Sequence, residues 1–492
     1  MRKKQSNFEK IYRIFLYAMP MALFFSYWPW MNFGSNSTMN FDLSLPLVWL
    51  VLFDILAFVL IIKKKLLKKM LSKWTWLVFP FFLTISILWS QDKLRGILIM
   101  GILWLLYFAV FAFSVLKKEI ADEKFWRTFL KIFFGTGLFV CAWCLVQCIM
   151  DIAGVSQGGT LLCDGCVYRI FGFPHPNGFA AEPQFMGNLL LAPSIVSLYL
   201  LLKNKFFSRK SLVIMFFIFV ATLFLTLSRG AIYAFIVAMI FFTIVWGIKN
   251  TWKVLRIWLV VGLAFLFTLN MQGIFSELSK TNDTYVSGVS KVINQLTLGI
   301  VDLGGSQVKK DNDSTQIKEA QSNAQTEETQ VEVLPDEEVK NQEGEKIEIG
   351  NAVFDGYVEV STNSRMTMWK SALSLWSKRL YTMVFGVGIG SALFSIYENG
   401  LLDTSREIIN NQYVSLLLET GIVGIMLLAW SLWLVYKAFS KSPDKIMLFS
   451  LMIAYMVSAL FFSGLPNVLH IYLLPAILMI ILGGGKSSYR KQ

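Results

Sequence analysis

Five charged residues stand beside or within otherwise apolar stretches of this sequence: Arg169, Glu182, Arg229, Arg365 and Glu419. A charge in such surroundings is costly unless it is paired or used. Arginine stays charged and donates bidentate hydrogen bonds, which suits a diphosphate, and a carboxylate can accept a proton. These residue types therefore predict a diphosphate site with a carboxylate nearby.

Glu182 ends the run RIFGFPHPNGFAAE, which is followed by Pro183. The prolines and glycines at 172–178 preclude a helix there, whereas Pro183 fits the first turn of the next helix. Glu182 then faces the N-terminus of that helix. Two interpretations remain open: Glu182 only caps the helix, or it is a site carboxylate that acts as a base or positions an arginine or a sugar hydroxyl.

Arg229 lies in TLSRGAIYAF, between two apolar stretches with almost no loop. A lone arginine there can simply extend its guanidinium toward water. Alternatively, it joins Arg169 and Arg365 in a triad that binds a diphosphate. His175 can be a general base near neutral pH, or an ordinary loop histidine.

The sequence does not favour metal chemistry. It contains no HExxH motif and no cluster with two pairs of cysteine or histidine residues. Cys163 and Cys166 form CDGC, for which a local disulfide or two free thiols are favoured over zinc. No metal and no cofactor is therefore predicted.

The composition is that of an integral membrane protein. Hydrophobic residues make up 55% of the chain, charged residues 16%, and the mean hydropathy is +0.57. A soluble domain would be about 25% charged. No cleavable signal peptide is expected, because the apolar stretch after the basic N-terminus continues to Trp30 without a small-residue cleavage site.

Apolar stretches of membrane-spanning length predict an all-α fold with about twelve transmembrane helices. Their expected bounds are 11–30, 43–62, 74–90, 97–116, 126–150, 186–202, 211–227, 231–248, 254–272, 412–436, 446–464 and 469–483. Lysines and arginines gather in alternate short segments, and the opposite short segments hold only Lys93, Arg95, Arg169 and Arg229. This bias predicts that both termini are cytoplasmic. It also accounts for the net charge of +13 without a nucleic-acid partner.

A long polar segment, 273–411, separates a nine-helix region (1–272) from a three-helix region (412–492), and the orientation places it outside the cell, between helices nine and ten. Residues 305–350 are acidic and poor in large apolar residues, which predicts a disordered tether. Residues 363–380 repeat apolar side chains every four positions, which predicts an amphipathic helix on the membrane surface or over the bundle.

Several motifs occur in a specific order along the chain. They are SILWSQDKLRG, RIFGFPHPNGFAAEPQFMG, LSRGA, Arg365 with Trp369 as R-x-x-x-W, FGVGIG, and NNQYVSLLLETGIVG. With the long loop, they make the chain resemble the O-antigen ligase and polymerase superfamily, including the Wzy-type polysaccharide polymerases and the lipid A-core ligases.

The resemblance implies a GT-C-like, metal-independent glycosyltransferase of the bacterial cell membrane. It implies polymerisation of undecaprenyl-diphosphate-linked oligosaccharide repeat units into a surface polysaccharide such as a capsule, on the outer face. Its partners would be lipid-linked oligosaccharides, membrane lipids, a chain-length regulator and a flippase. Carried over by position, Arg169, Arg229, Arg365 and Asn411 become contacts for the diphosphate or the glycan.

The chain departs from the ligases at one point. A His-Asn pair in the ligases is replaced here by Asn410 and Asn411, so the ligase's proposed base is missing. Glu182 is then the first candidate for the base and His175 the second, while Glu419 packs beside Gly421 in a structural role. A ligase that transfers finished glycan and a polysaccharide flippase remain the alternatives.

Overall fold

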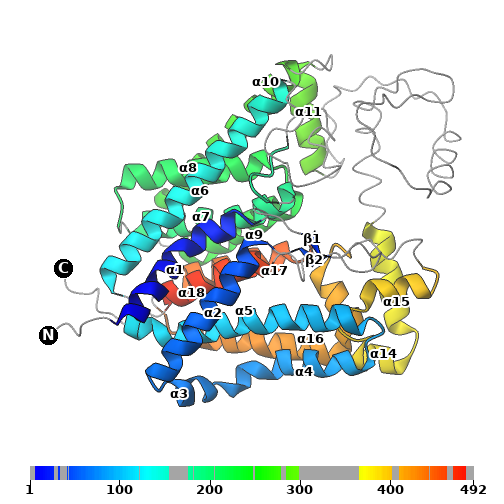
Figure 1. Cartoon of the computed structure of the whole chain (residues 1–492). Coiled ribbons are helices and arrows are strands. Elements are labelled where there is room, and N and C mark those ends of the chain that lie inside the picture. The colour runs from blue at the N-terminus through cyan, green and yellow to red at the C-terminus, as the bar shows by residue number, and fades with distance from the viewer. Residues whose placement is uncertain are drawn as a thin grey trace, which may run out of the picture.

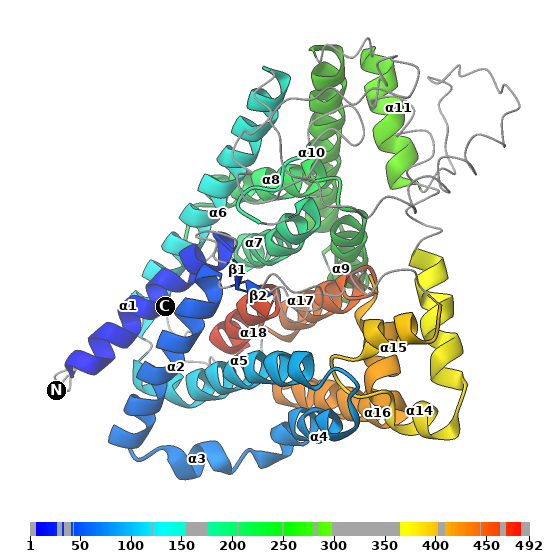
Figure 2. The same ribbon diagram turned by 45° about the vertical axis from the view of Figure 1, so that its right-hand side comes forward.

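The structure is a computed structural model of the chain, shown in Figures 1 and 2. It describes residues 6–26, 32–33, 41–42, 44–120, 122–153, 175–180, 182–203, 206–247, 250–278, 284–297, 365–401, 409–442, 444–462 and 469–483. Within these ranges the chain is helical, apart from turns and the short antiparallel pair β1 (Asn32–Phe33) and β2 (Phe41–Asp42).

The helices follow the predicted spans closely. Their bounds are α1 (Asn7–Phe24), α2 (Leu45–Lys63), α3 (Leu67–Leu71), η1 (Trp74–Leu77), α4 (Val78–Ser86), η2 (Ile87–Trp89), α5 (Lys93–Ile120), α6 (Glu123–Ile152), α7 (Pro183–Lys203), α8 (Arg209–Leu225), α9 (Arg229–Gly247), α10 (Thr251–Leu278), α11 (Tyr285–Leu296), α14 (Leu380–Phe385), α15 (Ala392–Glu398), α16 (Gln412–Phe439), α17 (Lys445–Ser458) and α18 (Leu469–Gly483). One further helix covers 365–377.

Among the described residues, seven helices are long and apolar enough to cross a membrane: α2, α5, α6, α7, α9, α10 and α16. The other predicted spans form shorter helices at α1, α4 with η2, α8, α17 and α18. The prediction of an all-helical, multi-pass membrane protein is confirmed. Helix α17 ends at Ser458, six residues before the predicted end of its span, and a turn follows.

The membrane helices differ in how deeply they are buried. In α7, 83% of the spanning stretch is buried, whereas in α16 only 6% is. Helix α7 packs against α8, α9 and α17 inside the larger group of helices. Helices α4, α5 and α16 lie side by side at its edge, around a separate small core (Figures 1 and 2).

The segment between α10 and α16 contains helices of its own. Helix α11 was not predicted, and it packs against α10, which continues six residues beyond the predicted boundary at 272. The predicted helix 363–380 corresponds to 365–377 and packs on α15 and the start of α16 through Ala372 and Leu375. The predicted tether, 305–350, lies outside the described residues.

A glycine-rich turn at 386–391 joins the helix 365–377 and α14 to α16 and α5. The N–H groups of Val387 and Gly388 donate to the carbonyls of Leu418 and Glu419, at 2.9 and 2.8 Å. The Glu419 carboxylate accepts from Gly390 N–H at 3.1 Å. Glu419 therefore has the structural role that was expected, beside the kink at Gly421.

The same turn rests on the segment that leads into α5. The hydroxyls of Ser90 and Ser391 are 2.6 Å apart, and Ile389 N–H donates to Ser86 Oγ at 3.2 Å. Two motifs about 300 residues apart in the sequence thus contact each other: SILWSQDKLRG and the segment that begins with FGVGIG.

Replacing Gly386 by alanine is expected to destabilise this contact. Gly386 has a φ of +75°, and an added Cβ would lie 2.3 Å from the carbonyl carbon of Glu419. Gly400→Ala is the matched control, because Gly400 also has a positive φ, of +65°, but has open space around its Cβ position. Both substitutions carry the strain of a positive φ, about 1–3 kcal/mol. We expect Gly386→Ala to lower the thermal unfolding midpoint clearly more than Gly400→Ala, because only Gly386→Ala adds a clash with the backbone of Glu419. Equal midpoints would contradict the close contact.

Candidate functional site

Three helices begin around one turn of the chain, residues 459–462, which we call the α17 turn. From α7, the Gln184 side-chain amide donates to the Phe461 carbonyl at 2.8 Å. From α16, Gln412 N–H donates to the carbonyls of Ala459 and Phe462, at 2.9 and 3.1 Å. The N-termini of α7 and α16 are therefore held at the same place.

Helix α9 meets the same turn through its first residues. A Cβ added to Gly230 would lie 2.7 Å from the Cβ of Phe461, and the rings of Tyr233 and Phe461 are 5.7 Å apart. Only glycine allows this close approach. Arg229, the first residue of α9, is therefore placed beside the α17 turn, half-buried.

Arg229 also faces the segment that follows α10. It interacts electrostatically with Tyr233, whose hydroxyl donates to the carbonyl of Leu296 at 2.5 Å. Leu296 is the last residue of α11, so this unpredicted helix closes one side of the region around Arg229. Arg229 therefore lies among packed helices and is not an isolated arginine at the surface.

Glu182 both begins helix α7 and has a carboxylate that is not used by the helix cap. Its backbone carbonyl accepts from the N–H groups of Phe185 and Met186, at 3.0 and 3.2 Å, and so begins α7. Its side chain is exposed and lies near the guanidinium of Arg365. The cap is therefore made by the backbone, which leaves the carboxylate available for another task.

The surroundings set the protonation of the Glu182 carboxylate. Partial desolvation raises the pKa of Glu182, and the positive charge of Arg365 offsets only part of this effect. A base works best when its pKa approaches the working pH. The shift therefore makes this carboxylate better suited to accept a proton than an ordinary surface glutamate.

Arg365 reaches this place because the helix 365–377 begins there. That helix buries Met368, Ala372 and Leu375, and packs against Leu393 of α15 and Leu418 of α16. The helix is thus fixed to the glycine-rich turn and to α16. The structure brings Glu182 and Arg365 together from segments that are far apart in the sequence.

A comparison with protein families finds a match over residues 214–429 to the family described as O-antigen ligase. The resemblance to the O-antigen ligase and polymerase superfamily is confirmed, and with it an O-antigen ligase-like or polymerase-like activity of glycosyl-transfer type. No curated protein and no solved structure matches the chain.

The O-antigen ligase region, residues 214–429, holds Arg229, Arg365 and Asn411 and the glycine-rich turn. Glu182 and His175 lie before it, in the segment that leads into α7. The region that the family defines thus contains Arg229 and Arg365, and the preceding part of the chain contains the carboxylate on which the charge of Arg365 acts.

Asn411 caps the first turn of α16 in the O-antigen ligase region. Its side-chain oxygen accepts from the N–H groups of Tyr413 and Val414, at 3.0 and 3.1 Å, and the residue is buried. This N-cap explains why an asparagine suits the position. A substrate contact by Asn411 stays a prediction.

His175 lies in a loop that is held rigidly against α6. Gln147 accepts from Gly178 N–H at 2.8 Å, and its side-chain amide donates to Asn177 Oδ1 and to the Gly178 carbonyl, both at 3.1 Å. The left-handed backbone of Gly178, with a φ of +61°, allows this clamp. The loop 175–180 is therefore fixed to α6 shortly before Glu182 in the chain, a feature that the sequence signals only by its prolines and glycines.

Burial lowers the pKa of His175 to about 4, although a hydrogen bond with the backbone of Thr226 opposes the shift. A neutral imidazole whose conjugate acid is this strong is a weak base at pH 7. His175 links the loop to the turn before α9, close in sequence to Arg229. These properties favour Glu182 over His175 as the base.

The remaining predictions concern residues that the structure does not describe, or metals. Arg169, Cys163 and Cys166 lie outside the described residues, so the third arginine of the triad stays a prediction. Within the described part of the chain, no group of three or more His, Cys, Asp or Glu side chains could hold a metal ion.

Proposed function

We propose that the protein polymerises undecaprenyl-diphosphate-linked oligosaccharide repeat units on the outer face of the bacterial cell membrane. The observation that supports this proposal is that α7, α9 and α16 begin around the α17 turn, with Arg229 at the start of α9 and Glu182, on which the charge of Arg365 acts, at the start of α7. Arginine charge and a carboxylate are what transfer from a lipid diphosphate needs.

In the proposed reaction, the growing glycan is transferred from its lipid diphosphate to a sugar hydroxyl of a new lipid-linked repeat unit. The hydroxyl oxygen forms a bond to the anomeric carbon, and the bond from that carbon to the diphosphate oxygen breaks. The hydroxyl proton passes to the Glu182 carboxylate, and the electron pair of the broken bond leaves with the diphosphate. Proton removal and correct positioning of the hydroxyl are the main tasks left to the protein.

The electrostatics around the α17 turn suit the leaving diphosphate. Arg229 and Arg365 keep their charge and can each donate two hydrogen bonds to phosphate oxygens. The first turns of three helices add partial positive charge at the same place. Arg169 would complete the triad.

The proposed orientation follows from the positions of the basic residues. Lys64, Lys203 and Lys253 lie at the end of the bundle opposite the α17 turn, at or next to the ends of α2, α7 and α10. Positive charge favours the cytoplasmic side. The α17 turn then faces outward, both termini are cytoplasmic, and both lipid-linked substrates approach within the membrane.

A ligase that transfers finished glycan to another acceptor is the second candidate, since the matched family is described as O-antigen ligase. The replacement of the expected His-Asn pair by Asn410 and Asn411 favours the polymerase. Asn410 stands where that pair has its histidine, and its side-chain amide is not a titratable base.

The test is the glycan profile of a deletion strain, together with the purified protein and synthetic lipid-linked repeat units. A polymerase leaves a single repeat unit on lipid in the deletion strain, and elongates repeat units in detergent. Full-length glycan that stays on the lipid after deletion would identify a ligase. If the purified protein elongates nothing and the deletion strain still makes long chains, the polymerase proposal is contradicted.

The charge of Arg365 is expected to set the acid limit of activity. Because this charge lowers the pKa of Glu182, Arg365→Met should raise that pKa. A carboxylate base is lost as pH falls through its pKa, so activity should disappear at a higher pH in the variant than in the wild type. The measurement is the pH profile of kcat/KM. Arg379→Met, at an exposed turn residue, should leave the acid limb in place. If the acid limb of the pH profile does not shift in Arg365→Met, the charge of Arg365 does not act on the catalytic base.

A further inference from the structure

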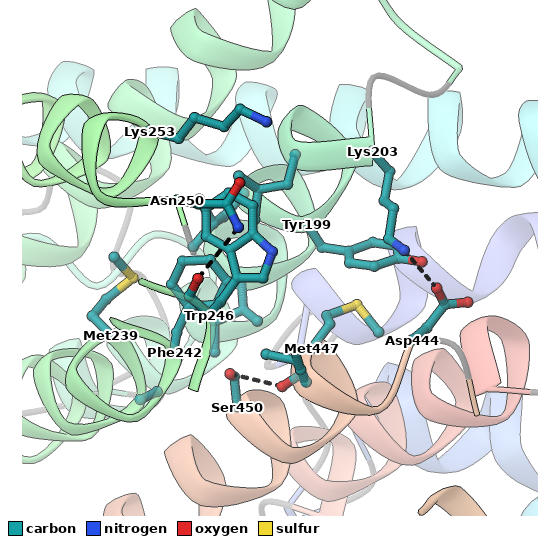
Figure 3. Close-up of a pocket in the computed structure, with 15 residues that line it drawn as sticks. Tyr199, Lys203, Met239, Phe242, Trp246, Asn250, Lys253, Asp444, Met447 and Ser450 are labelled. Atoms are coloured by element: carbon teal, nitrogen blue, oxygen red, sulfur yellow. Dashed lines mark hydrogen bonds and ion pairs between the residues drawn. The ribbon is translucent and has the colours of Figure 1, made fainter. Parts of the chain in front are cut away.

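A second feature of the molecule lies at the opposite end of the bundle from the α17 turn. A cavity of about 340 Å³ opens between α7, α9, α17 and the start of α10 (Figure 3). Its volume falls within the roughly 300–1,000 Å³ that is typical of small-molecule sites. Nothing in the proposed glycosyl transfer uses it.

The mouth of the cavity carries an excess of positive charge. Lys203, the last residue of α7, pairs with Asp444 at 3.7 Å, and Asp444 also interacts with the hydroxyl of Tyr199. Lys253 lies across the mouth, above the ring of Trp246 at 5.8 Å (Figure 3). Lys253 makes no ion pair with any residue in the described ranges. An anion is therefore the complementary partner.

The floor of the cavity is apolar. Ala238 and Phe242 of α9 and Met447 of α17 line it, and all three are buried. The hydroxyl of Ser450 donates to the carbonyl of Ile446 in its own helix at 2.9 Å, so its hydrogen-bond donor is already satisfied. The site thus combines a polar, basic rim at the helix ends with an apolar interior along the spans.

The rim sits where a membrane surface would lie. Lys203 ends α7, Asp444 precedes α17, and Lys253 lies in the first turn of α10. Tryptophan and tyrosine rings such as those of Trp246 and Tyr199 favour the same depth, at the boundary of headgroups and acyl chains. A soluble anion would match the rim but not the apolar floor.

We propose that this cavity binds a phospholipid with an anionic headgroup, from the leaflet at this end of the bundle. The headgroup phosphate contacts Lys253 and the rim, and an acyl chain covers Phe242 and Ala238. Basic pockets between membrane helices are suited to anionic headgroups. With the orientation proposed above, this is the cytoplasmic leaflet. The site stands whether or not the protein is a polymerase.

The experiment compares phosphatidylglycerol, phosphatidylcholine with the same acyl chains, and inorganic phosphate, each added to the purified full chain in detergent. The readouts are the thermal unfolding midpoint and native mass spectrometry of retained lipid. We expect phosphatidylglycerol alone to raise the midpoint and to be retained. An equal effect of phosphatidylcholine would contradict the preference for an anionic headgroup. An equal effect of phosphate would contradict the proposal that the ligand is a phospholipid.

Two variants and one control locate the site. Lys253→Gln should weaken phosphatidylglycerol binding about fivefold, which corresponds to about 1 kcal/mol for one lysine at a lipid surface. Ala238→Phe should abolish binding by filling the floor without changing charge. Lys124→Gln, at an exposed lysine at the start of α6, should bind as the wild type does. Unchanged binding in Lys253→Gln would overturn the proposal, even if Ala238→Phe failed to fold.

Discussion

Arg229→Ala is expected to abolish chain extension while the protein level stays unchanged. Arg229 is held beside the α17 turn by the close contact of Gly230 with Phe461, so its position does not depend on its own side chain. If it stabilises the leaving diphosphate, its loss should lower kcat by about 100-fold or more, as expected for removal of a donor to developing negative charge. The measurement is polymer length from purified protein and lipid-linked repeats.

Two further variants make the result for Arg229 specific. Arg229→Lys keeps the charge but not the two-pronged donor, and should recover part of the activity. Arg256→Ala removes an exposed arginine at the opposite end, in the first turns of α10, and should extend chains normally. Long glycan made by Arg229→Ala at wild-type rate would exclude Arg229 from the diphosphate site.

Glu182→Gln is expected to produce the second large loss. The substitution keeps the size of the side chain and leaves the backbone carbonyl that begins α7, so the fold should be retained. It removes the proton acceptor, and the turnover number should fall by roughly 100- to 10,000-fold, the usual contribution of general base catalysis. KM should change little, because the amide can still accept hydrogen bonds from a sugar hydroxyl.

The controls for Glu182 separate proton transfer from positioning. Glu182→Asp keeps a carboxylate on a shorter side chain and should retain more activity than Glu182→Gln. Glu398→Gln changes an exposed glutamate at the end of α15 and should be neutral. If Glu182→Gln lost affinity rather than turnover, the carboxylate would position the acceptor and another group would be the base.

The sequence does not show which membrane helices are buried by other helices and which face lipid. Helices α7 and α16 are both uniformly apolar, yet 83% of one spanning stretch is buried and only 6% of the other. In a soluble protein the polar face of a helix would mark the exposed side. In a membrane the exposed side faces lipid and is also apolar, so the sequence carries no comparable signal.

Other differences have equally specific causes. Helix α17 ends at Ser458 because the following turn accepts hydrogen bonds from Gln184 and Gln412, which lie far away in the sequence. Helix α11 was not predicted because it is short and lies in a polar segment, although its apolar residues recur at helical spacing. Its contact with α10 includes small residues, with Gly288 against Ser276 and Gly273 against the ring of Tyr285.

The sequence by itself determined the membrane fold, the order of the spans, the family motifs and the charged residues that form the candidate site. These follow from bilayer thickness, which sets the length of an apolar helix, and from the cost of burying charge, which makes each such residue informative. Tertiary structure alone decided that the charge of Arg365 acts on Glu182 and that three helices begin at the α17 turn. It also decided that Lys203 and Lys253 flank a cavity at the other end. Contacts between distant segments depend on which uniformly apolar helices pack together, and composition does not encode that choice.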